Sequence, residues 1–526
     1  MRNSVVWFCV LVCGPLCFAQ VAVSTYHNDN YRSGANTHEV SLTPTSVTQQ
    51  NFGRVRVFTV QGYVYAQPLY VPNLTINGTS HNVVFIATEH DQVYAFDSST
   101  GAQLWQANLL KGSGPLFVIS PVSSDDVNCS DLVPEIGVTG TPVIDTTTNT
   151  LYVVAKLKEY DARTQTTTFH QVLHALNIQT GADRVSPHQI TGTFPGNGSG
   201  SSGGILTFDP LVEAQRSSLL LLNGQVYIGW ASHCDNGDYH GWLMSFNKNT
   251  LNSTGVYVDT PNGYEGGFWA SGSGPAADSA GSIYAPTGNG DFSVSSGGTD
   301  YGDSILRLRP GSIQGLAVSD YFTPWDQMTL DDNDSDVASG GVLLLPDQPG
   351  SHYPHLLVQV GKEGTIDLVN RDNMGHFHQG NDSQIVQTLP YAISGLWGAP
   401  AFWNNTAYFG GANQEMTAWS FNPTTQLLAT SPTSETPESM GYPGTTPSVS
   451  SNGNSNGIVW TNERGSQFAV LHAYQATNLG TELYNSEQNP SRDRAGSPVK
   501  FAVPTIADGK VFVGVQNQVS MYGLLH

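Results

Sequence analysis

A short unit of sequence recurs along almost the whole chain, and this repeat limits the fold more than any other feature. Its clearest copy spans 67–105 and contains the segments 83–88 and 92–97, followed by a turn at 98–101. Each segment is rich in β-branched and aromatic residues and is bounded by Gly, Asp or Asn, which is typical of a β-strand. The unit therefore predicts a meander of four antiparallel strands, and its repetition predicts an array of similar sheets.

Seven further copies follow this first one. They lie at 140–181, 226–229, 282–285, 356–358, 407–410, 457–460 and 503–522. The last copy has only three strands, of which two are expected at 511–514 and 519–522. A ring of meanders must join its last sheet to its first, and the segment 52–58 is placed to supply the missing strand. The sequence therefore predicts an all-β fold, an eight-bladed β-propeller of four-stranded antiparallel blades whose last blade is closed by an N-terminal strand.

The composition agrees with a chain of short strands and many turns. Of the 526 residues, 56 are Gly and 29 are Pro, while charged residues make up only 12%. This balance disfavours a helical bundle, a coiled coil and a disordered chain. The 20 Lys and Arg residues against 42 Asp and Glu residues give a net charge of −22. Such a surface repels nucleic acid and anionic membranes, which excludes both as partners.

Residues 1–19 have the pattern of a secretory signal peptide. Arg2 precedes an apolar run at 5–18, and the small Ala19 lies directly before Gln20. The run is too short for a membrane anchor. We therefore expect a secreted or periplasmic protein without a membrane span, with an N-terminal segment at 20–51 and the propeller at 52–526.

Two cysteines, Cys129 and Cys234, remain once that peptide is removed. An even pair in an oxidising compartment favours one disulfide. The alternative, which the sequence leaves open, is two buried thiols that do not meet.

The pattern at 84–105, Val-Phe-Ile-Ala-Thr, then Gln-Val-Tyr-Ala-Phe-Asp, Thr-Gly and Leu-Trp, resembles the repeat of the quinoprotein alcohol dehydrogenase-like propellers. The resemblance extends over 26–526, and Tyr31 to Gly34 looks like the family's approach to its first blade. Enzyme members of this family hold pyrroloquinoline quinone (PQQ) and Ca²⁺ in the central funnel. Other propellers with this repeat are not enzymes and include outer-membrane assembly factors, so the repeat predicts the fold more strongly than the activity.

Two segments resemble the part of the dehydrogenases that lies under the quinone. Gly266-Gly267-Phe268-Trp269 implies that Trp269 stacks on the flat cofactor, and the segment 284–290 implies that Asn289 ligates Ca²⁺ through its amide oxygen. The structural alternative is that Trp269 packs between blades and Asn289 forms a turn.

The acidic segment 323–345 resembles the source of the catalytic carboxylate in these enzymes. Asp334 and Asp336 match best by position, and Asp334 could also ligate the metal. Five Asp residues at 326–336 are equally typical of a solvated acidic loop. Lys362 lies between two glycines and matches the cation that these enzymes place over the quinone oxygens. The resemblance implies that Lys362 acts in catalysis and in cofactor binding. Arg371 follows nearby in the sequence.

Several family features are missing from the chain. The dehydrogenases have a clamp of adjacent cysteines, but here Cys129 is followed by Ser130, and Glu135 lies where a cofactor-binding arginine is expected. The glutamate ligand of Ca²⁺ is replaced by a stretch in which Asp235, Asn236 or Asp238 could offer oxygen. There is no Cys-x-x-Cys-His motif, and we expect no haem.

Three hypotheses about function remain open from the sequence, which does not decide whether the chain is an enzyme. The first is a divergent quinoprotein-type dehydrogenase that acts on an alcohol or sugar with PQQ and Ca²⁺. The alternative is a non-catalytic propeller that binds a protein or glycan through the loops of the funnel face. The third is a different enzyme in the same funnel, with His27, Glu89, His90 and His240 as candidate residues. A related option is a transition-metal site formed by His233, Asp238 and His240.

Overall fold

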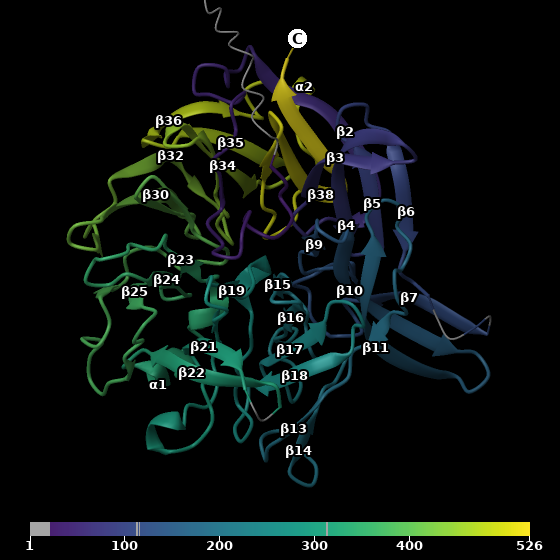
Figure 1. Cartoon of the computed structure of the whole chain (residues 1–526), viewed down its shortest axis with the longest axis vertical. Helices are drawn as coiled ribbons and strands as arrows, with labels where there is room; N and C mark the ends of the chain where they lie inside the picture. Colours follow the sequence, from purple (N-terminus) through teal and green to yellow (C-terminus); the bar gives the residue numbers. More distant parts are fainter. Residues whose placement is uncertain (1–20, 112–113, 115, 312–313, 526) are drawn as a thin grey trace, which may run out of the picture.

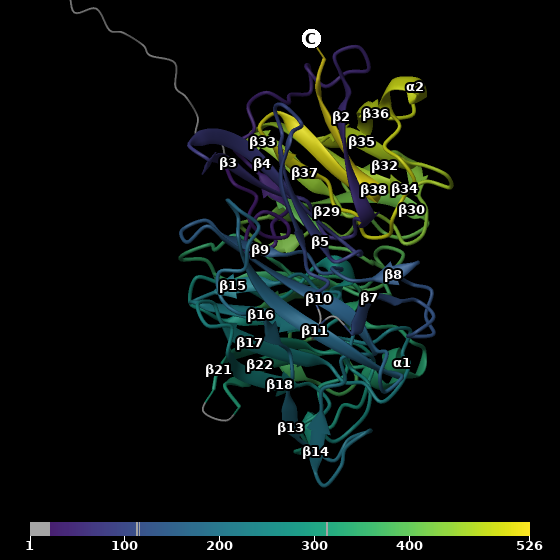
Figure 2. The same cartoon turned by 90° about the vertical axis from the view of Figure 1, so that its right-hand side faces the viewer.

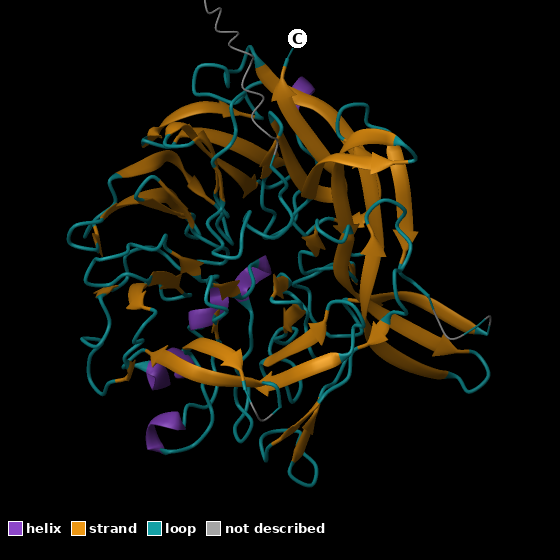
Figure 3. Cartoon of the chain, viewed as in Figure 1, coloured by secondary structure: helices purple, strands orange, loops and turns teal. Residues whose placement is uncertain are grey.

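The computed structural model describes residues 21–111, 114, 116–311 and 314–525, so the predicted signal peptide at 1–19 lies outside the described residues. Eight sheets in this part of the chain are arranged as blades around a central axis (Figure 1). Nearly all regular structure is strand, with a few short helical turns, some near the middle of the ring (Figure 3). The predicted all-β propeller is confirmed.

The first four blades take their strands almost in chain order. Blade one contains β3 (Leu69–Ile76), β4 (Thr79–Thr88), β5 (Gln92–Asp97) and β6 (Gln103–Asn108). Blade two contains β7 (Phe117–Ser123), β8 (Glu135–Ile136), β9 (Val143–Asp145), β10 (Thr150–Asp161), β11 (Thr166–Asn177) and β12 (His188–Gln189). Blade three contains β15 (Leu220–Leu222), β16 (Gln225–Gly229), β17 (Trp242–Asn247) and β18 (Ser253–Val258). Blade four contains β19 (Ala276–Ala277), β20 (Ile283–Pro286), β21 (Ile305–Pro310), β22 (Leu316–Thr323) and the later β26 (His376–Phe377).

The last four blades complete the ring. Blade five contains β23 (Leu343–Leu344), β24 (Leu356–Val360), β25 (Ile366–Asn370) and β27 (Gln387–Leu389). Blade six contains β28 (Ala401–Trp403), β29 (Thr406–Phe409), β30 (Gln414–Asn422), β31 (Leu427–Leu428) and β32 (Ser434–Met440). Blade seven contains β1 (Ala35–Asn36), β33 (Ser448–Asn452), β34 (Ser455–Arg464), β35 (Ala469–Gln475) and β36 (Asn478–Asn485). Blade eight contains β37 (Thr505–Ala507), β38 (Lys510–Leu524) and β2 (Phe52–Tyr63).

The remaining elements lie in the connections. They are a hairpin of β13 (Thr193–Pro195) and β14 (Ile205–Thr207), the 3₁₀ turns η1 (Ala270–Gly272), η2 (Val294–Ser296) and η3 (Val337–Ser339), and the helices α1 (Gln327–Asp332) and α2 (Pro490–Asp493). The hairpin projects from the end of the ring opposite the C-terminus in both views (Figures 1 and 2).

The hydrophobic core consists of layers between successive blades. Strand β5 is buried at every position because both of its faces are covered, whereas exposed and buried residues alternate along β2 at the closing edge. The larger apolar clusters each join two neighbouring blades, for example β4 and β5 with β10, or β24 and β25 with β29. A chain with many short, two-faced strands can bury its apolar residues in this way without a single central core.

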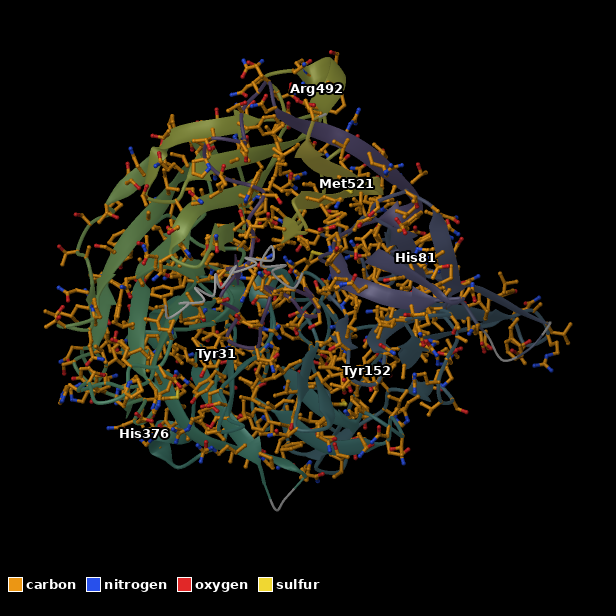
Figure 4. All side chains as sticks on the ribbon, turned by 45° about the horizontal axis from the view of Figure 1, so that its top comes forward. Tyr31, His81, Tyr152, His376, Arg492 and Met521 are labelled. Atoms are coloured by element: carbon orange, nitrogen blue, oxygen red, sulfur yellow. A yellow bond between two sulfur atoms is a disulfide. The ribbon has the colours of Figure 1, made fainter. Side chains whose placement is uncertain are left out.

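The ring closes by pairing of its two ends, as predicted. Strand β2 runs antiparallel to β38, with Phe52 opposite Leu524 and Phe58 opposite Val519. The two strands expected at 511–514 and 519–522 form one continuous element, because Gln516 between them also pairs with Tyr63 of β2. Figure 4 shows Met521 within this blade and Arg492 further out, in α2.

The N-terminal segment contacts the first strand of every blade. In Figure 1 this purple segment runs from the top of the ring toward its centre. Backbone or side-chain hydrogen bonds join Val23 to Tyr70, Ser24 to Ile144, Asn30 to Leu221 and Ala277, Tyr31 to Leu344, Ser33 to Phe402, Gly34 to Val449 and Asn36 to Ile506. These contacts follow the order of the blades from one to eight, so the segment links all of them around the axis.

A fully buried arginine fixes this segment. The guanidinium of Arg32 donates hydrogen bonds to Thr25 Oγ1 at 2.8 Å, to Tyr26 O at 3.0 Å and twice to Pro275 O. It also donates to Leu219 O at 3.3 Å, so one side chain joins the segment to the entrances of blades three and four. Burial lowers the pKa of Arg32 to about 10.

A buried histidine in blade seven predicts a pH-dependent part of the stability. The imidazole of His472 lies 2.8 Å from Glu482, 3.2 Å from Glu438 and 3.2 Å from Glu463. Burial alone would lower its pKa, but the three carboxylates outweigh burial and raise it to about 10. Because the folded pKa exceeds the unfolded value, this stabilisation is complete below about pH 6.5 and is lost as the pH rises through about 10.

We therefore expect His472→Gln to lower the free energy of unfolding more at pH 6 than at pH 10. Urea unfolding of both proteins at several pH values measures this difference. His355→Gln is the control, because His355 pairs with Asp372 at a half-exposed site. A destabilisation by His472→Gln that stays constant from pH 6 to pH 10 would contradict the assignment.

Candidate functional site

A cavity of about 570 Å³ lies among the segments that lead into the blades. Six of its lining residues come four to six positions before the first strand of a blade: Arg216, Ser271, Ser339, Trp397, Tyr442 and Phe501. Longer loops contribute the others, which include Asp131, Cys234, Asp235, Trp269, Asp334, Asp336 and Lys362. The cavity is therefore built from most of the blades.

Five residues that the sequence singled out for chemistry line this one cavity. Asp235, Trp269, Asp334, Asp336 and Lys362 come from four different loops and meet here. Asn289 lies directly behind Asp336, to which its backbone N–H donates at 2.8 Å. Asn236 lies elsewhere: its amide donates to Val127 O and Asn128 O, both at 3.1 Å, and braces that loop.

Asp336 is fixed at both carboxylate oxygens. Its Oδ2 lies 2.6 Å from Lys362 Nζ, and its Oδ1 accepts the hydrogen bond from Asn289 N. Lys362 also pairs with Asp334, whose side chain is 76% exposed, whereas that of Asp336 is only 10% exposed. Burial would lower the pKa of Lys362, but Asp336 and Asp334 raise it, so the lysine stays charged. The structure thus separates the two predicted aspartates into a buried, oriented one and a solvent-facing one.

The side chain of Asn289 is oriented for a ligand on its amide oxygen. Its Nδ2 donates to Asp303 at 3.1 Å, and its Oδ1 is buried and has no hydrogen-bond partner among the described residues. Burial and then Asp336 raise the pKa of Asp303 well above its usual value. Glu265 belongs to the same acidic region: burial and then Asp235 raise its pKa to about 7. Sequence reasoning missed Asp303 and Glu265, because neither lies in the segments that were matched to the cofactor site of the family.

One edge of the Trp269 indole ring lies against the backbone of several glycines. Its indole N–H donates to Gly266 O at 3.0 Å, and Tyr239 packs against it at a ring-centroid distance of 6.1 Å. A Cβ atom on Gly267 would come within 2.8 Å of the indole nitrogen, and one on Gly288 within 2.6 Å. The glycines around Trp269 are therefore required by the close approach of the ring to the backbone.

The predicted disulfide between Cys129 and Cys234 is present, with the Cα atoms 5.7 Å apart. It joins positions 105 residues apart and borders the cavity at Cys234. Asp235, the next residue, accepts a hydrogen bond from Tyr239 at 2.8 Å. A long-range bridge therefore lies in the cavity wall of a chain that lacks the adjacent-cysteine clamp.

Arg216 supplies a second cation that sequence reasoning missed. Its guanidinium lies over the Phe501 ring at 4.2 Å and lies 3.9 Å from Asp131, which also pairs with Lys500 at 2.9 Å. Arg371, the arginine suggested by sequence proximity, is not in the lining: it is buried in blade five and pairs with Asp347 at 2.6 Å. That suggestion is therefore corrected, because Arg371 follows the end of β25 and contacts Asp278 and the Tyr31 ring instead of the cavity.

The residues of the third hypothesis do not share the cavity. His27 is stacked on Tyr26 in the N-terminal segment, and burial lowers its pKa to about 4. Glu89 accepts hydrogen bonds from Gly137 N and Thr139, and His90 pairs with Glu135.

The suggested transition-metal site is also not assembled. His240 bonds to Thr260 and Ser199 O, His233 lies 2.7 Å from Lys156 Nζ, and Asp238 bonds to Ser199. Among the described residues, three potential metal ligands lie within 4.8 Å of one another only at Cys129, Asp131 and Cys234, and at Glu438, His472 and Glu482. These structural bonds explain why the histidines and acids do not meet.

Comparison with known proteins shows which solved structures share this fold. No family model matches the sequence, and no curated protein matches it either. The quinohemoprotein alcohol dehydrogenase from Comamonas testosteroni is similar in structure, with a TM-score of 0.61 and 14% identity over 95% of this chain and 80% of that chain. A europium-containing methanol dehydrogenase has a TM-score of 0.58 and 11% identity over 96% and 98% of the two chains.

BamB from Moraxella catarrhalis is also similar, with a TM-score of 0.50 and 12% identity over 90% of this chain and 99% of that chain. The chain thus has the PQQ-like propeller fold, which dehydrogenases and BamB share. None of the helices in the described ranges has the length and hydropathy needed to span a bilayer.

Proposed function

We propose that the chain is a secreted or periplasmic, divergent quinoprotein-type dehydrogenase that holds PQQ and Ca²⁺ in the central cavity and oxidises an alcohol or sugar. One observation carries the proposal. Trp269, Asp336 and Lys362, each suggested by a separate resemblance, line the same 570 Å³ cavity as Asp235, which lies in the stretch that replaces the family's glutamate ligand. Fold alone would not bring this set of side chains together at one point.

The lining fits PQQ together with a divalent cation rather than PQQ alone. PQQ is flat and carries three carboxylates, and the aromatic rings of Trp269, Trp397, Tyr442 and Phe501 suit a flat ligand. Arg216 and Lys362 can meet carboxylates, but four acids line the same cavity: Asp131, Asp235, Asp334 and Asp336. A cation must offset this excess of negative charge, and the unpartnered Asn289 Oδ1 beside Asp336 offers a hard oxygen ligand for Ca²⁺.

Bound there, PQQ would supply the two-electron acceptor for alcohol oxidation. Asp336 is the residue placed to accept the hydroxyl proton of the substrate, because it is buried and lines the cavity. Lys362 and Asn289 N hold its carboxylate in one orientation. Trp269 covers one side of the cavity, and the disulfide at Cys234 limits movement of the wall near Asp235.

We expect Asp336→Asn to lower dye-linked alcohol oxidation about 10²–10⁴-fold, the usual contribution of a general base. Asparagine keeps an oxygen for the metal, so PQQ binding should survive. Asp334→Asn is the matched control, and its effect should be much smaller because Asp334 faces solvent. Steady-state rates with PQQ and Ca²⁺ measure both variants; full activity of Asp336→Asn would remove Asp336 from the chemistry.

The alternative function is a non-catalytic propeller that binds a protein or glycan at the funnel face. The observation in its favour is an aromatic pair at the cavity mouth: Trp397 and Tyr442 lie edge to face at 5.4 Å, and Tyr442 is 46% exposed. Exposed aromatic rings of this kind stack on sugars and anchor protein partners. Binding of a glycan array in the absence of PQQ, lost in Tyr442→Ala, would support this alternative.

A further inference from the structure

A second, smaller pocket of about 190 Å³ lies beside the central cavity, between blades four and five. The segment 334–337 and the turn 361–363 separate the two. Asp336 and Lys362 line the central cavity, whereas their neighbours Val337, Gly361 and Glu363 line the second pocket. The second pocket is therefore a distinct space that shares a wall with the proposed cofactor site.

The charged groups of this pocket are all acidic. Asp326, Glu363, Asp367 and Asp382 line it, and no lysine, arginine or histidine does. In the described part of the chain, none of these four carboxylates forms an ion pair. They accept hydrogen bonds from hydroxyl and backbone N–H groups, such as Thr388 to Asp367 at 3.0 Å and Trp325 N to Asp382 at 2.9 Å. Of these four acids, only Asp326 belongs to the acidic segment 326–336, so the cluster forms where that segment meets blade five.

A buried amide adds an unsatisfied acceptor to the same pocket. Gln359 lines the pocket and is 1% exposed. Its Nε2 donates to Val337 O at 2.7 Å, Gly340 O at 2.9 Å and Val360 O at 3.2 Å, which fixes the orientation of the amide. Its Oε1 is buried and has no donor among the described residues. A buried acceptor without a donor costs free energy, which a ligand N–H would recover.

Two exposed aromatic residues flank the entrance. Trp325 is 47% exposed and Tyr391 is 72% exposed, and both line the pocket. Tyr391 has a φ of 51°, a left-handed conformation that is uncommon for a bulky residue. Its backbone N–H donates to Thr365 Oγ1 at 3.3 Å. Strained positions of this type occur often at ligand sites, and aromatic faces attract cations.

The buried carboxylates also repel one another. Burial and then Asp382 raise the pKa of Asp367 to about 8, and burial and then Asp326 raise that of Asp382 to about 6. A bound cation would relieve this repulsion.

We propose that this second pocket binds a small organic cation, a primary amine with a short alkyl chain, through carboxylates and the Gln359 amide oxygen, with Trp325 and Tyr391 beside its charged end. A positive ligand matches a lining whose charged groups are all acidic. Its N–H groups supply the donor that Gln359 lacks, and its alkyl chain suits a space too small for a disaccharide. The site is independent of PQQ and Ca²⁺.

Calorimetry with 1,4-diaminobutane at 150 mM NaCl tests the proposal, on protein without PQQ or Ca²⁺. We expect binding tighter than about 1 mM, and at least tenfold weaker binding to Asp367→Asn and to Tyr391→Ala. Because Tyr391 is exposed, Tyr391→Ala should fold even if the variant of the buried Asp367, Asp367→Asn, does not. Asp332→Asn is the charge-matched control, because Asp332 is exposed and outside the pocket, and it should bind as the wild type does.

Two further four-carbon probes complete the test. Neutral 1,4-butanediol and anionic succinate have the same chain length and should give no heat. The proposal would be overturned if the diamine does not bind. It would also be overturned if the diamine binds equally to wild type and to both pocket variants, because this result would mean non-specific attraction to an acidic surface. Binding of butanediol or glucose as strong as that of the diamine would also overturn it and would indicate a neutral hydroxyl ligand.

Discussion

Arg32→Met should lower the free energy of unfolding by about 3–5 kcal/mol, because each buried acceptor left without its donor costs about 1–3 kcal/mol and several are affected. Arg32 is fully buried and donates to Thr25 Oγ1 and to three backbone carbonyls, those of Tyr26, Leu219 and Pro275. Methionine fills similar space but leaves these acceptors without donors. Urea unfolding followed by tryptophan fluorescence measures the loss.

The control for this prediction is Arg163→Met. Arg163 pairs with Asp161 at an exposed turn, so its removal should change the unfolding midpoint very little. An Arg32→Met midpoint equal to that of Arg163→Met would show that the N-terminal segment does not depend on Arg32 for its position.

The second large effect concerns the disulfide. Replacing both Cys129 and Cys234 with serine should lower the free energy of unfolding by about 4–5 kcal/mol, because the bridge closes a loop of about 100 residues in the unfolded chain. The two cysteines are 105 positions apart. Thermal and urea unfolding of the double variant measure the change, and reduced wild-type protein should behave like the variant.

Asn236→Ala serves as the matched control for the double serine variant. It removes the hydrogen bonds to Val127 O and Asn128 O beside the bridge but leaves the bridge itself. We expect a smaller loss, of about 1 kcal/mol per hydrogen bond. Equal midpoints for oxidised wild type and the double serine variant would contradict a stabilising role for the disulfide.

The blades and their closure could be predicted because they depend on local patterns that repeat. Segments such as 83–88 and 92–97 carry strand composition and turn residues at fixed places, and the structure forms β4 and β5 there. Strands β10 and β11 are longer than their apolar cores, since pairing continues through polar residues such as Lys156 and Glu159. Polar side chains give no strand signal, so the sequence pattern marks only the apolar part of this hairpin.

The path of the N-terminal segment could not be predicted. Its contacts with the blades are made largely by backbone carbonyls of Ser24, Asn30, Tyr31, Ser33 and Gly34. Every residue type has a carbonyl, so no side-chain pattern marks such contacts. Only the folded ring brings the first strands of all eight blades within reach of one short segment.

The candidate site was predicted in part. Trp269, Asp336 and Lys362 were found through family resemblance, while Arg216 and Phe501 were missed. The repeat itself contained a usable signal, because residues four to six positions before the first strand line the cavity in six of the blades. Asp367 and Tyr391 of the second pocket carry no motif, and their meeting depends on how blade five folds.

The most direct test of the central claim is calorimetry of PQQ binding to the chain from Gln20 onward, with and without Ca²⁺. We predict a dissociation constant below about 10 μM, or binding stronger than about 7 kcal/mol, only when Ca²⁺ is present. Trp269→Ala should abolish this binding, whereas Trp325→Ala, a tryptophan outside the central cavity, should leave it unchanged. No heat in the presence of Ca²⁺, or equal binding by the Trp269→Ala protein, would contradict the proposed cofactor site.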